Sequence, residues 1–522
     1  MRFIDYFHKG MARDPDRAFL VQDATSLSYR EVDEMTDRIA AGLQGFEAVE
    51  HSAVLSPNDP IAFACVLGAL RAGHTWLPVN VRNSAESNIS FLRKAMCDVL
   101  FYHSSMSAQA AAMLDKVDRI RLAVCLDAEP EAASDVHISL RTLESLRPTP
   151  ARDVPANPDR IVMLAATGGT TGEPKAVMQS ESVWESVIGT FWTCCPTSVP
   201  PVHLAVGPMT HGAGGLALMM MAGGTTNVIM RKAEPRLIME AVQQHGVTHM
   251  YLPPTLIYAL LDHPELPSFD FSSLKYLVVS ASPIAPDKLK EAVEVFGDAV
   301  CQGYGQAEAP MLLTFMSNQD LRCAAPGDDA QLPRRFASCG RATLNTRVEV
   351  MDDTGALLPA GEKGEIVARG GMIFSGYFNN TAATEEARQF GWHHTGDVGF
   401  KDENGFVYIV DRKKDMIITG GFNVFSGEVE NVILGHPAVL ECAVIGVPDA
   451  KWGEAIKAVV LLKSGQTATA DEIIAMVKGK LGGVHAPKSV EFWPDLPRSP
   501  NNKVVKAEIR RQFWTGNDRA VG

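Results

Sequence analysis

A chain of 522 residues, 46% hydrophobic and 21% charged, has the composition of an ordinary globular protein and is long enough for two or three domains. Its formal net charge of −13 argues against nucleic acid as the main partner, because phosphate contacts need clustered lysine and arginine. Nine cysteines without metal-ligand spacing fit reduced thiols in a cytoplasmic protein better than a disulfide framework.

The sequence predicts no integral membrane span and no secretory signal. Residues 1–10 mix charged and apolar side chains, unlike a signal sequence. The longest stretch without Asp, Glu, Lys or Arg covers residues 186–230, and its most apolar part is 216–222. A span needs about 20 consecutive apolar residues, whereas this stretch contains histidines, threonines and many glycines. We therefore expect a buried helix followed by a buried strand.

Over the first 400 residues, short apolar runs alternate with segments of helix length. We predict strands at 53–56, 247–252 and 274–280, and helices at 60–72 and 286–295. Short apolar strands separated by amphipathic helices imply α/β layers with largely parallel sheets.

From residue 346 the pattern changes to short β segments broken by turns. We predict strands at 347–351, 364–369 and 406–410, then a small α+β region with elements at 429–434, 440–447, 455–462 and 471–481. The fold class is therefore α/β multidomain with a β-rich part. The charged run 411–415 lies at the junction, and by itself it is most simply a solvated turn.

A glycine- and threonine-rich run after the apolar stretch 161–166 predicts a phosphate cradle. It is Thr167-Gly168-Gly169-Thr170-Thr171-Gly172-Glu173-Pro174-Lys175. Glycines let the backbone approach a ligand, hydroxyls donate hydrogen bonds and the lysine adds positive charge. The run is not a Walker loop, because Glu173 and Pro174 separate the last glycine from Lys175. Taken alone, a flexible turn between strand and helix is the alternative.

Three further motifs add groups suited to a nucleotide. Gly303-Tyr304-Gly305-Gln306-Ala307-Glu308 offers an aromatic face, a close-approach glycine and a carboxylate, and Thr395-Gly396-Asp397 offers acceptors for a ribose diol, with Arg412 following. The segment 497–503 ends in Lys503 on a turn before a polar helix. Each motif alone is most simply a turn, a hairpin or a solvated residue.

Together and in this order, the motifs resemble the adenylate-forming superfamily, in its acyl-CoA and aryl-CoA synthetase branch. The resemblance covers nearly the whole chain, including the motifs at 71–73, 77–80, 340–341, 364–366, 376–377, 448–449 and 453–454. It implies an N-terminal domain at 1–411, with a β-rich subdomain at about 340–411, and a small mobile C-terminal domain at 412–522. It also implies ATP, Mg²⁺ and CoA as the cofactor and co-substrates.

In this family a carboxylate attacks the α-phosphate of ATP to give an acyl-adenylate and pyrophosphate, and the acyl group then passes to a thiol. Both reactants of the first step are anions, so catalysis must come from positioning and from positive charge at the developing pentavalent phosphate. The resemblance implies the following roles: the loop Thr167 to Gly172, with Lys175, around the phosphates; Glu308 and Thr170 on Mg²⁺; Tyr304 and Gly305 at adenine; Asp397 and Arg412 at ribose; and Lys503 bridging the carboxylate and the α-phosphate.

The resemblance also places a hinge at Lys414 and a pantetheine passage at Gly420 and Gly421, where a side chain would obstruct the CoA thiol. A plain hairpin is the alternative for the two glycines. Proline at position 414 is expected to impair thioester formation alone.

The acid substrate is predicted from the segment around His211, which matches the family segment beside the acid pocket. His211 is a candidate catalytic residue, with a core histidine as the alternative. Ala213, Gly214 and Gly215 are expected to leave space, and no carboxylate suited to a substrate amino group is nearby. We therefore expect a hydrophobic acid, aliphatic or aromatic, in preference to an amino acid.

Three positions depart from the family pattern. Ala307 replaces a threonine, Gly168 replaces a frequent serine, and Asn502 replaces the glycine before the adenylation lysine. We interpret these changes as modulation. Two alternatives stay open: an enzyme that loads a carrier-protein thiol, and a nucleotide-binding protein with weak or no turnover. The expected partners are small molecules, and a homodimer is left open.

Overall fold

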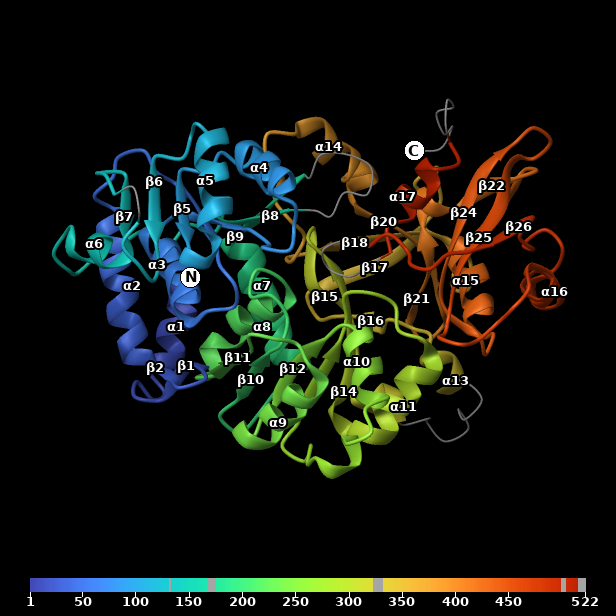
Figure 1. The fold of residues 1–522 in the computed structure, drawn as a ribbon, viewed down its shortest axis with the longest axis horizontal. Helices are drawn as coiled ribbons and strands as arrows, with labels where there is room; N and C mark the ends of the chain where they lie inside the picture. The colour runs from blue at the N-terminus through green and yellow to red at the C-terminus, as the bar shows by residue number, and fades with distance from the viewer. Residues whose placement is uncertain (131–132, 167–174, 323–331, 499–503, 515–522) are drawn as a thin grey trace. The chain divides into compact units, whose positions relative to one another are not determined.

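The computed structural model describes residues 1–130, 133–166, 175–322, 332–498 and 504–514 (Figure 1). The predicted phosphate loop before Lys175, and Lys503, therefore lie outside the described residues. The chain forms two compact units. The first takes in the described residues of 1–168, 173–348 and 368–393, and the second those of 349–367 and 394–522. The predicted boundary between 411 and 412 stays a prediction.

The first unit is built on two large sheets. Among the described residues, one has nine strands in the order β16 (Arg341–Ala342), β15 (Ala309–Met316), β14 (Val300–Gln306), β13 (Tyr276–Val279), β12 (His249–Leu252), β10 (Val202–Ala205), β11 (Thr226–Ile229), β1 (Ala18–Gln22) and β2 (Thr25–Ser28). The other has eight, in the order β19 (Gly376–Tyr377), β9 (Ala176–Ser180), β8 (Ile161–Ala166), β4 (Thr75–Pro78), β3 (His51–Leu55), β5 (Val99–Tyr102), β6 (Leu122–Cys125) and β7 (His137–Ser139). In the nine-stranded sheet, every neighbouring pair between β14 and β1 is parallel. In the eight-stranded sheet, every neighbouring pair between β8 and β7 is parallel. These pairings confirm the predicted sheet type.

Helices cover these sheets and share a core with both of them. The common core takes residues from α1 (Ile4–Met11), α2 (Tyr29–Leu43), α3 (Pro60–Ala72), α7 (Glu181–Cys194) and α8 (Gly212–Met220). α4 (Ala85–Lys94) and α5 (Ser107–Lys116) pack in a second core on the eight-stranded sheet. α9 (Pro235–His245), α10 (Pro254–Leu261) and α11 (Pro286–Phe296) lie along the nine-stranded sheet (Figure 1). The remaining helices are α6 (Leu140–Ser145), α12 (Asn318–Arg322), α13 (Leu332–Arg335) and α14 (Thr381–Glu386).

Helix α3 shows how local sequence fixes an element. The Asp59 side chain accepts hydrogen bonds from the Ile61 and Ala62 amides at 2.8 and 3.1 Å, and Pro60 occupies the first turn. Most of its side chains are buried, because a helix that is apolar all round belongs inside a core. The predicted helix at 60–72 is confirmed.

The apolar stretch 216–222 is likewise internal. Residues 216–220 form the buried part of α8, and β11 follows after a short turn. Within the part of the chain that the structure describes, no helix has both the length and the apolar character that a bilayer crossing requires.

The second unit contains most of a four-stranded sheet and a second sheet against which three helices pack. The four-stranded sheet has the order β17 (Thr346–Met351), β18 (Gly364–Gly370), β20 (His393–Lys401) and β21 (Val407–Arg412). The other contains β23 (Phe422–Val424), β22 (Ile417–Thr419), β25 (Gly453–Leu462) and β24 (Val439–Asp449), with β26 (Ser489–Phe492) on β25. α15 (Ser426–Leu434) and α16 (Ala470–Leu481) share one core with this sheet, and α17 (Lys506–Arg511) contributes to another.

Candidate active site

Three side chains from separate segments of the first unit lie together beside the end of the predicted phosphate loop. Lys175 directly precedes β9, Tyr377 lies in β19, which pairs with β9, and Glu308 lies between β14 and β15. The Lys175 Nζ atom is 4.8 Å from the centre of the Tyr377 ring. The Tyr377 hydroxyl donates a hydrogen bond of 2.8 Å to Glu308 Oε1. Tyr377 therefore links a cation on its ring face to an anion at its hydroxyl.

The environment keeps Tyr377 protonated. Burial raises the pKa of Tyr377, and the negative charge of Glu308 raises that pKa further. A neutral phenol donates, so it can hold the Glu308 carboxylate in one orientation. Glu308 is only 8% exposed, and its carbonyl accepts from the Phe374 amide at 2.8 Å. Both the side chain and the backbone of Glu308 are thus fixed.

The donor set at Glu308 fits Mg²⁺. This ion is usually held by one or two carboxylates together with substrate phosphates and water, not by a closed protein cage. The described residues contain no group of three or more His, Cys, Asp or Glu side chains placed to hold a metal. One oriented carboxylate that leaves the other ligand positions to phosphates and water suits this mode of binding. The second predicted ligand, Thr170, lies outside the described residues.

Ala307, which replaces the family threonine, has a packing partner. Its side chain packs against the apolar cluster that contains Val177, Phe374 and Tyr377. Its carbonyl accepts a hydrogen bond of 2.8 Å from the Gln179 side chain. A methyl group suits this apolar contact, whereas a hydroxyl would need a polar partner.

Gly305 is required by the protein's own backbone. A Cβ atom there would lie 2.6 Å from the Ala309 carbonyl oxygen and 2.7 Å from the Met311 amide, because β15 passes against it. The sequence predicted that a ligand approaches Gly305 closely; in the structure, strand β15 makes a close approach at this position. Tyr304 is half-buried and faces Thr314 across the same pair of strands. Its contact with adenine stays a prediction.

His211 is exposed and directly precedes α8, so the core-histidine alternative is wrong. The expectation of open space after it is also wrong at Gly214, where a Cβ atom would overlap the Met209 carbonyl oxygen. Gly212 is likewise filled, because a Cβ atom there would overlap the Tyr251 ring. These glycines allow close packing. The catalytic role of His211 stays a prediction.

In the second unit, Asp397 and Arg412 face each other across β20 and β21. Arg412 Nε lies 3.0 Å from Asp397 Oδ1, and Asp397 is only 4% exposed. The Asp397 amide donates to Thr395 Oγ1 at 3.1 Å. The structure thus brings together two residues that are fifteen positions apart in sequence and gives the carboxylate a fixed orientation.

The run 411–415 is not a solvated turn. Asp411 is buried and accepts hydrogen bonds from the Ser426 amide and, at 2.8 Å, from the Ser426 hydroxyl. Lys506 Nζ lies 2.8 Å from Glu430 Oε1 and donates to Ser426 Oγ at 2.7 Å. Arg510 pairs with Asp415 at 2.8 Å. We call this set the linker cluster; its members are Asp411, Asp415, Ser426, Glu430, Lys506 and Arg510.

The charges of the linker cluster shift one another's pKa values, and at Glu430 burial outweighs the neighbouring Lys506, so the pKa of that carboxyl is raised. Burial alone would lower the pKa of Lys506, but Glu430, Asp411 and Asp415 raise that pKa above its ordinary value. Lys414, the predicted hinge residue, differs, because burial and the neighbouring Arg412 lower its pKa. The positive charge is therefore favoured at Lys506, in α17, and disfavoured at Lys414, in the run 411–415.

Gly420 and Gly421 form the two-residue turn between β22 and β23, with φ of 57° and 82°. Two left-handed residues are typical of a type I′ hairpin turn, so the hairpin interpretation is confirmed. A Cβ atom at Gly420 would also lie 2.5 Å from the Trp452 ring. A role at the CoA thiol stays a prediction.

Comparison with known proteins identifies the family. Residues 7–378 match the AMP-binding enzyme family, and residues 428–503 match the AMP-binding enzyme C-terminal domain. A medium/long-chain-fatty-acid–CoA ligase of Mycobacterium tuberculosis is 36% identical over 94% of this chain and 86% of its own length. A feruloyl-CoA synthase of Amycolatopsis is 33% identical over 94% of each chain. An amide bond synthetase from Marinactinospora thermotolerans has the same fold, with a TM-score of 0.86 and 28% identity over 98% of this chain and all of that one.

The chain belongs to the AMP-binding enzyme family, in its acyl-CoA and aryl-CoA synthetase branch. It is an ATP-dependent, AMP-forming carboxylate–CoA ligase. The predicted family and activity are confirmed.

Two features of these sites were missed by the sequence analysis. Tyr377 appeared there only as part of a family motif, and its contacts depend on the pairing of β19 with β9. The linker cluster gave no signal beyond the spacing of Lys506, Ile509 and Arg510, which places them on one face of a helix.

Proposed function

We propose how named residues divide the work of this ligase, which activates a hydrophobic carboxylic acid with ATP and transfers the acyl group to CoA. The observation that carries the proposal is the arrangement of Lys175, Tyr377 and Glu308. It supplies a cation and an oriented carboxylate at the position where the family resemblance puts the triphosphate.

In the first half-reaction, the acid oxygen attacks the α-phosphate and pyrophosphate leaves. Lys175 and the hydroxyls of Thr170 and Thr171 bind the departing phosphates, and Lys503 holds the carboxylate against the α-phosphate. Glu308 and Thr170 are the residues that would hold Mg²⁺, which would supply positive charge against the phosphates. Tyr377 keeps the Glu308 carboxylate aimed without neutralising it, because the phenol remains protonated.

The adenosine part of ATP is held by other residues. Tyr304 and Gly305 lie along adenine, and the Asp397 carboxylate accepts hydrogen bonds from the two ribose hydroxyls. The Arg412 guanidinium, 3.0 Å from Asp397, supports this role by fixing the orientation of the carboxylate.

In the second half-reaction, the CoA thiol attacks the acyl carbonyl and AMP leaves. Lys414 is the hinge for this step, and Gly420 and Gly421 leave the passage for pantetheine. The exposed His211 lies beside the acid and is a candidate for gating its pocket.

The substrate is a hydrophobic acid. The names of similar proteins include ligases for medium- and long-chain fatty acids and for ferulate, which supports an aliphatic or aryl-substituted chain. The cytoplasmic location and a homodimer remain predictions.

A panel of acids tests the assignment of roles. Aliphatic and aryl acids are supplied with ATP and Mg²⁺, with and without CoA, and the acyl-adenylate and thioester are followed by mass. We expect adenylate without CoA and thioester with it. Lys503→Ala should slow adenylation about a hundredfold or more while sparing thioester formation from a preformed acyl-adenylate. Equal loss in both half-reactions would remove the role given to Lys503.

A further inference from the structure

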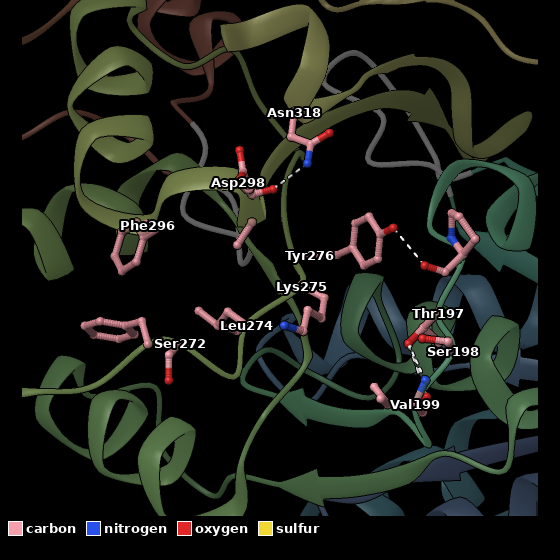
Figure 2. Close-up of a pocket in the computed structure, with 13 residues that line it drawn as sticks. Thr197, Ser198, Val199, Ser272, Leu274, Lys275, Tyr276, Phe296, Asp298 and Asn318 are labelled. Atoms are coloured by element: carbon pink, nitrogen blue, oxygen red, sulfur yellow. Dashed lines mark hydrogen bonds between the residues drawn. The ribbon is translucent and has the colours of Figure 1, made fainter.

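A groove in the first unit lies at one end of the strands of the nine-stranded sheet, and Glu308 lies at the other end. Its volume is about 620 Å³, and its walls are the segments 196–199, 271–276 and 296–299 (Figure 2). These segments lead into β10, β13 and β14, so the groove lies at the amino ends of three parallel strands. Glu308 follows the carboxyl end of β14. The groove and Glu308 therefore lie at opposite ends of β14.

One wall of the groove is apolar and aromatic. The Phe271 and Phe296 rings pack edge to face, with centres 5.0 Å apart. Leu274 and Ala299 are buried beneath, while Val199, on the other side, is 46% exposed. The volume lies in the usual range for small-molecule sites, and the apolar surface is presented mainly by half-buried Phe271 and exposed Val199, because Phe296 is buried as well.

Most polar groups of the groove have protein partners. Asp298 pairs with Arg322, and its carbonyl accepts from the Asn318 side chain at 2.8 Å. The Tyr276 hydroxyl donates to the Pro196 carbonyl at 2.8 Å (Figure 2). These groups therefore bond mainly to other groups of the protein.

Lys275 is the exception. It is exposed, and in the described part of the chain no ion pair is found for it. Figure 2 shows its amine between Leu274 and the segment with Thr197 and Val199. With Asp298 compensated by Arg322, Lys275 leaves the groove with one uncompensated positive charge beside an aromatic wall.

We propose that this groove binds a free hydrophobic carboxylate, with the carboxylate on Lys275 and the apolar chain against Phe271, Phe296 and Leu274. A single cation matches a single carboxylate, whereas a nucleotide or CoA would bring several phosphates and require several cations. The site therefore takes the same chemical class as the acid substrate, at the opposite end of β14 from Glu308. The proposal does not depend on the roles given to Lys503, Glu308 or Asp397.

Photolabelling of the full chain tests this. A medium-chain fatty acid with a diazirine in its chain is irradiated with the protein, and labelled peptides are located by mass. We expect label on peptides containing 271–276 or 296–299. In Lys275→Ala that label should fall about tenfold, and Lys275→Arg should restore it. Lys290→Ala, a lysine of α11 outside the groove lining, is the matched control and should label normally.

The probe's charge and the activity of the variant separate the outcomes. The matching fatty alcohol should label the groove about tenfold less than the acid. Equal labelling by acid and alcohol, unchanged labelling in Lys275→Ala, or stronger labelling by an acyl-CoA probe would each overturn the proposal. Because Lys275 is exposed, its variants should keep wild-type melting and ligase activity. Loss of the groove label with normal activity separates this proposal from the catalytic assignments.

Discussion

Two charged regions of the molecule use their ions in opposite ways. Lys175 and Glu308 are linked through a neutral phenol, which orients the carboxylate but brings no charge of its own. In the linker cluster, Asp411 is buried, Lys506 and Glu430 are partly buried, and all three are bonded to one another or to Ser426. The first arrangement orients a carboxylate through a neutral group, whereas the second uses charge to hold a segment in place. Substitutions should therefore affect activity in the first region and stability in the second.

The largest effect is expected for Lys506→Met. Removing the lysine leaves Glu430 buried without its cation, and breaking such a pair costs about 3–5 kcal/mol of unfolding free energy. Urea unfolding, followed by tryptophan fluorescence, measures the loss. The control is Lys363→Met, whose pair with Glu428 is more exposed and is worth less than about 1 kcal/mol. Equal losses in the two variants would contradict the structural role of the cluster.

Glu308→Gln should show the opposite pattern. It keeps an acceptor for the Tyr377 hydroxyl but removes the negative charge, so kcat/KM for ATP should fall about a hundredfold. Unfolding free energy should change by less than about 1 kcal/mol. Steady-state kinetics across Mg²⁺ concentrations and urea unfolding give the two numbers. Glu386→Gln, on an exposed side chain of α14, should leave both unchanged. A destabilised variant with normal kinetics would reverse the assignment.

Tyr377→Phe tests the neutral link itself. The ring stays beside Lys175, but the donor to Glu308 is lost, which should cost about tenfold in kcat/KM and raise the Mg²⁺ concentration needed for half-maximal rate. The control Tyr408→Phe removes a hydroxyl bonded to Asp402 in the second unit and should not alter the Mg²⁺ dependence. An unshifted Mg²⁺ dependence in Tyr377→Phe would show that the hydroxyl does not orient the ligand.

The smallest expected effect concerns acid stability. Burial alone would raise the pKa of Asp415, but Lys506 and Arg510 hold that pKa below the ordinary aspartate value of 3.8. Its stabilisation is therefore present above pH 3.8 and lost as the pH falls through the lower pKa of the folded state. Asp415→Asn should be less stable than wild type by about 1 kcal/mol near neutral pH, with the difference shrinking in acid. Urea unfolding at several pH values measures this. A constant difference would assign the effect to packing.

Sequence reasoning worked where the determinants were local. The helix at 60–72 was predicted from a continuous segment of sequence, and the structure shows that its cap and first-turn proline lie next to the apolar run. It failed at 411–415, because the partners of Asp411 and Asp415 come from positions 426 and 510. Charge alone suggested solvent, whereas the fold supplied counter-ions. The proximity of Asp397 and Arg412, expected from the family resemblance, is seen in the structure, but their ligand roles remain predictions.

The strand crossing at Gly305 bears on how such chains diverge. A descendant that stopped using ATP would still need glycine there, because β15 passes against that position with or without a nucleotide. Folding would still require glycine at position 305 after the adenylation activity had been lost. Positions 308 and 377, whose side chains make the link to the cation, would be released from that constraint first. Positions 308 and 377 should therefore be the ones used to distinguish an active family member from an inactive one.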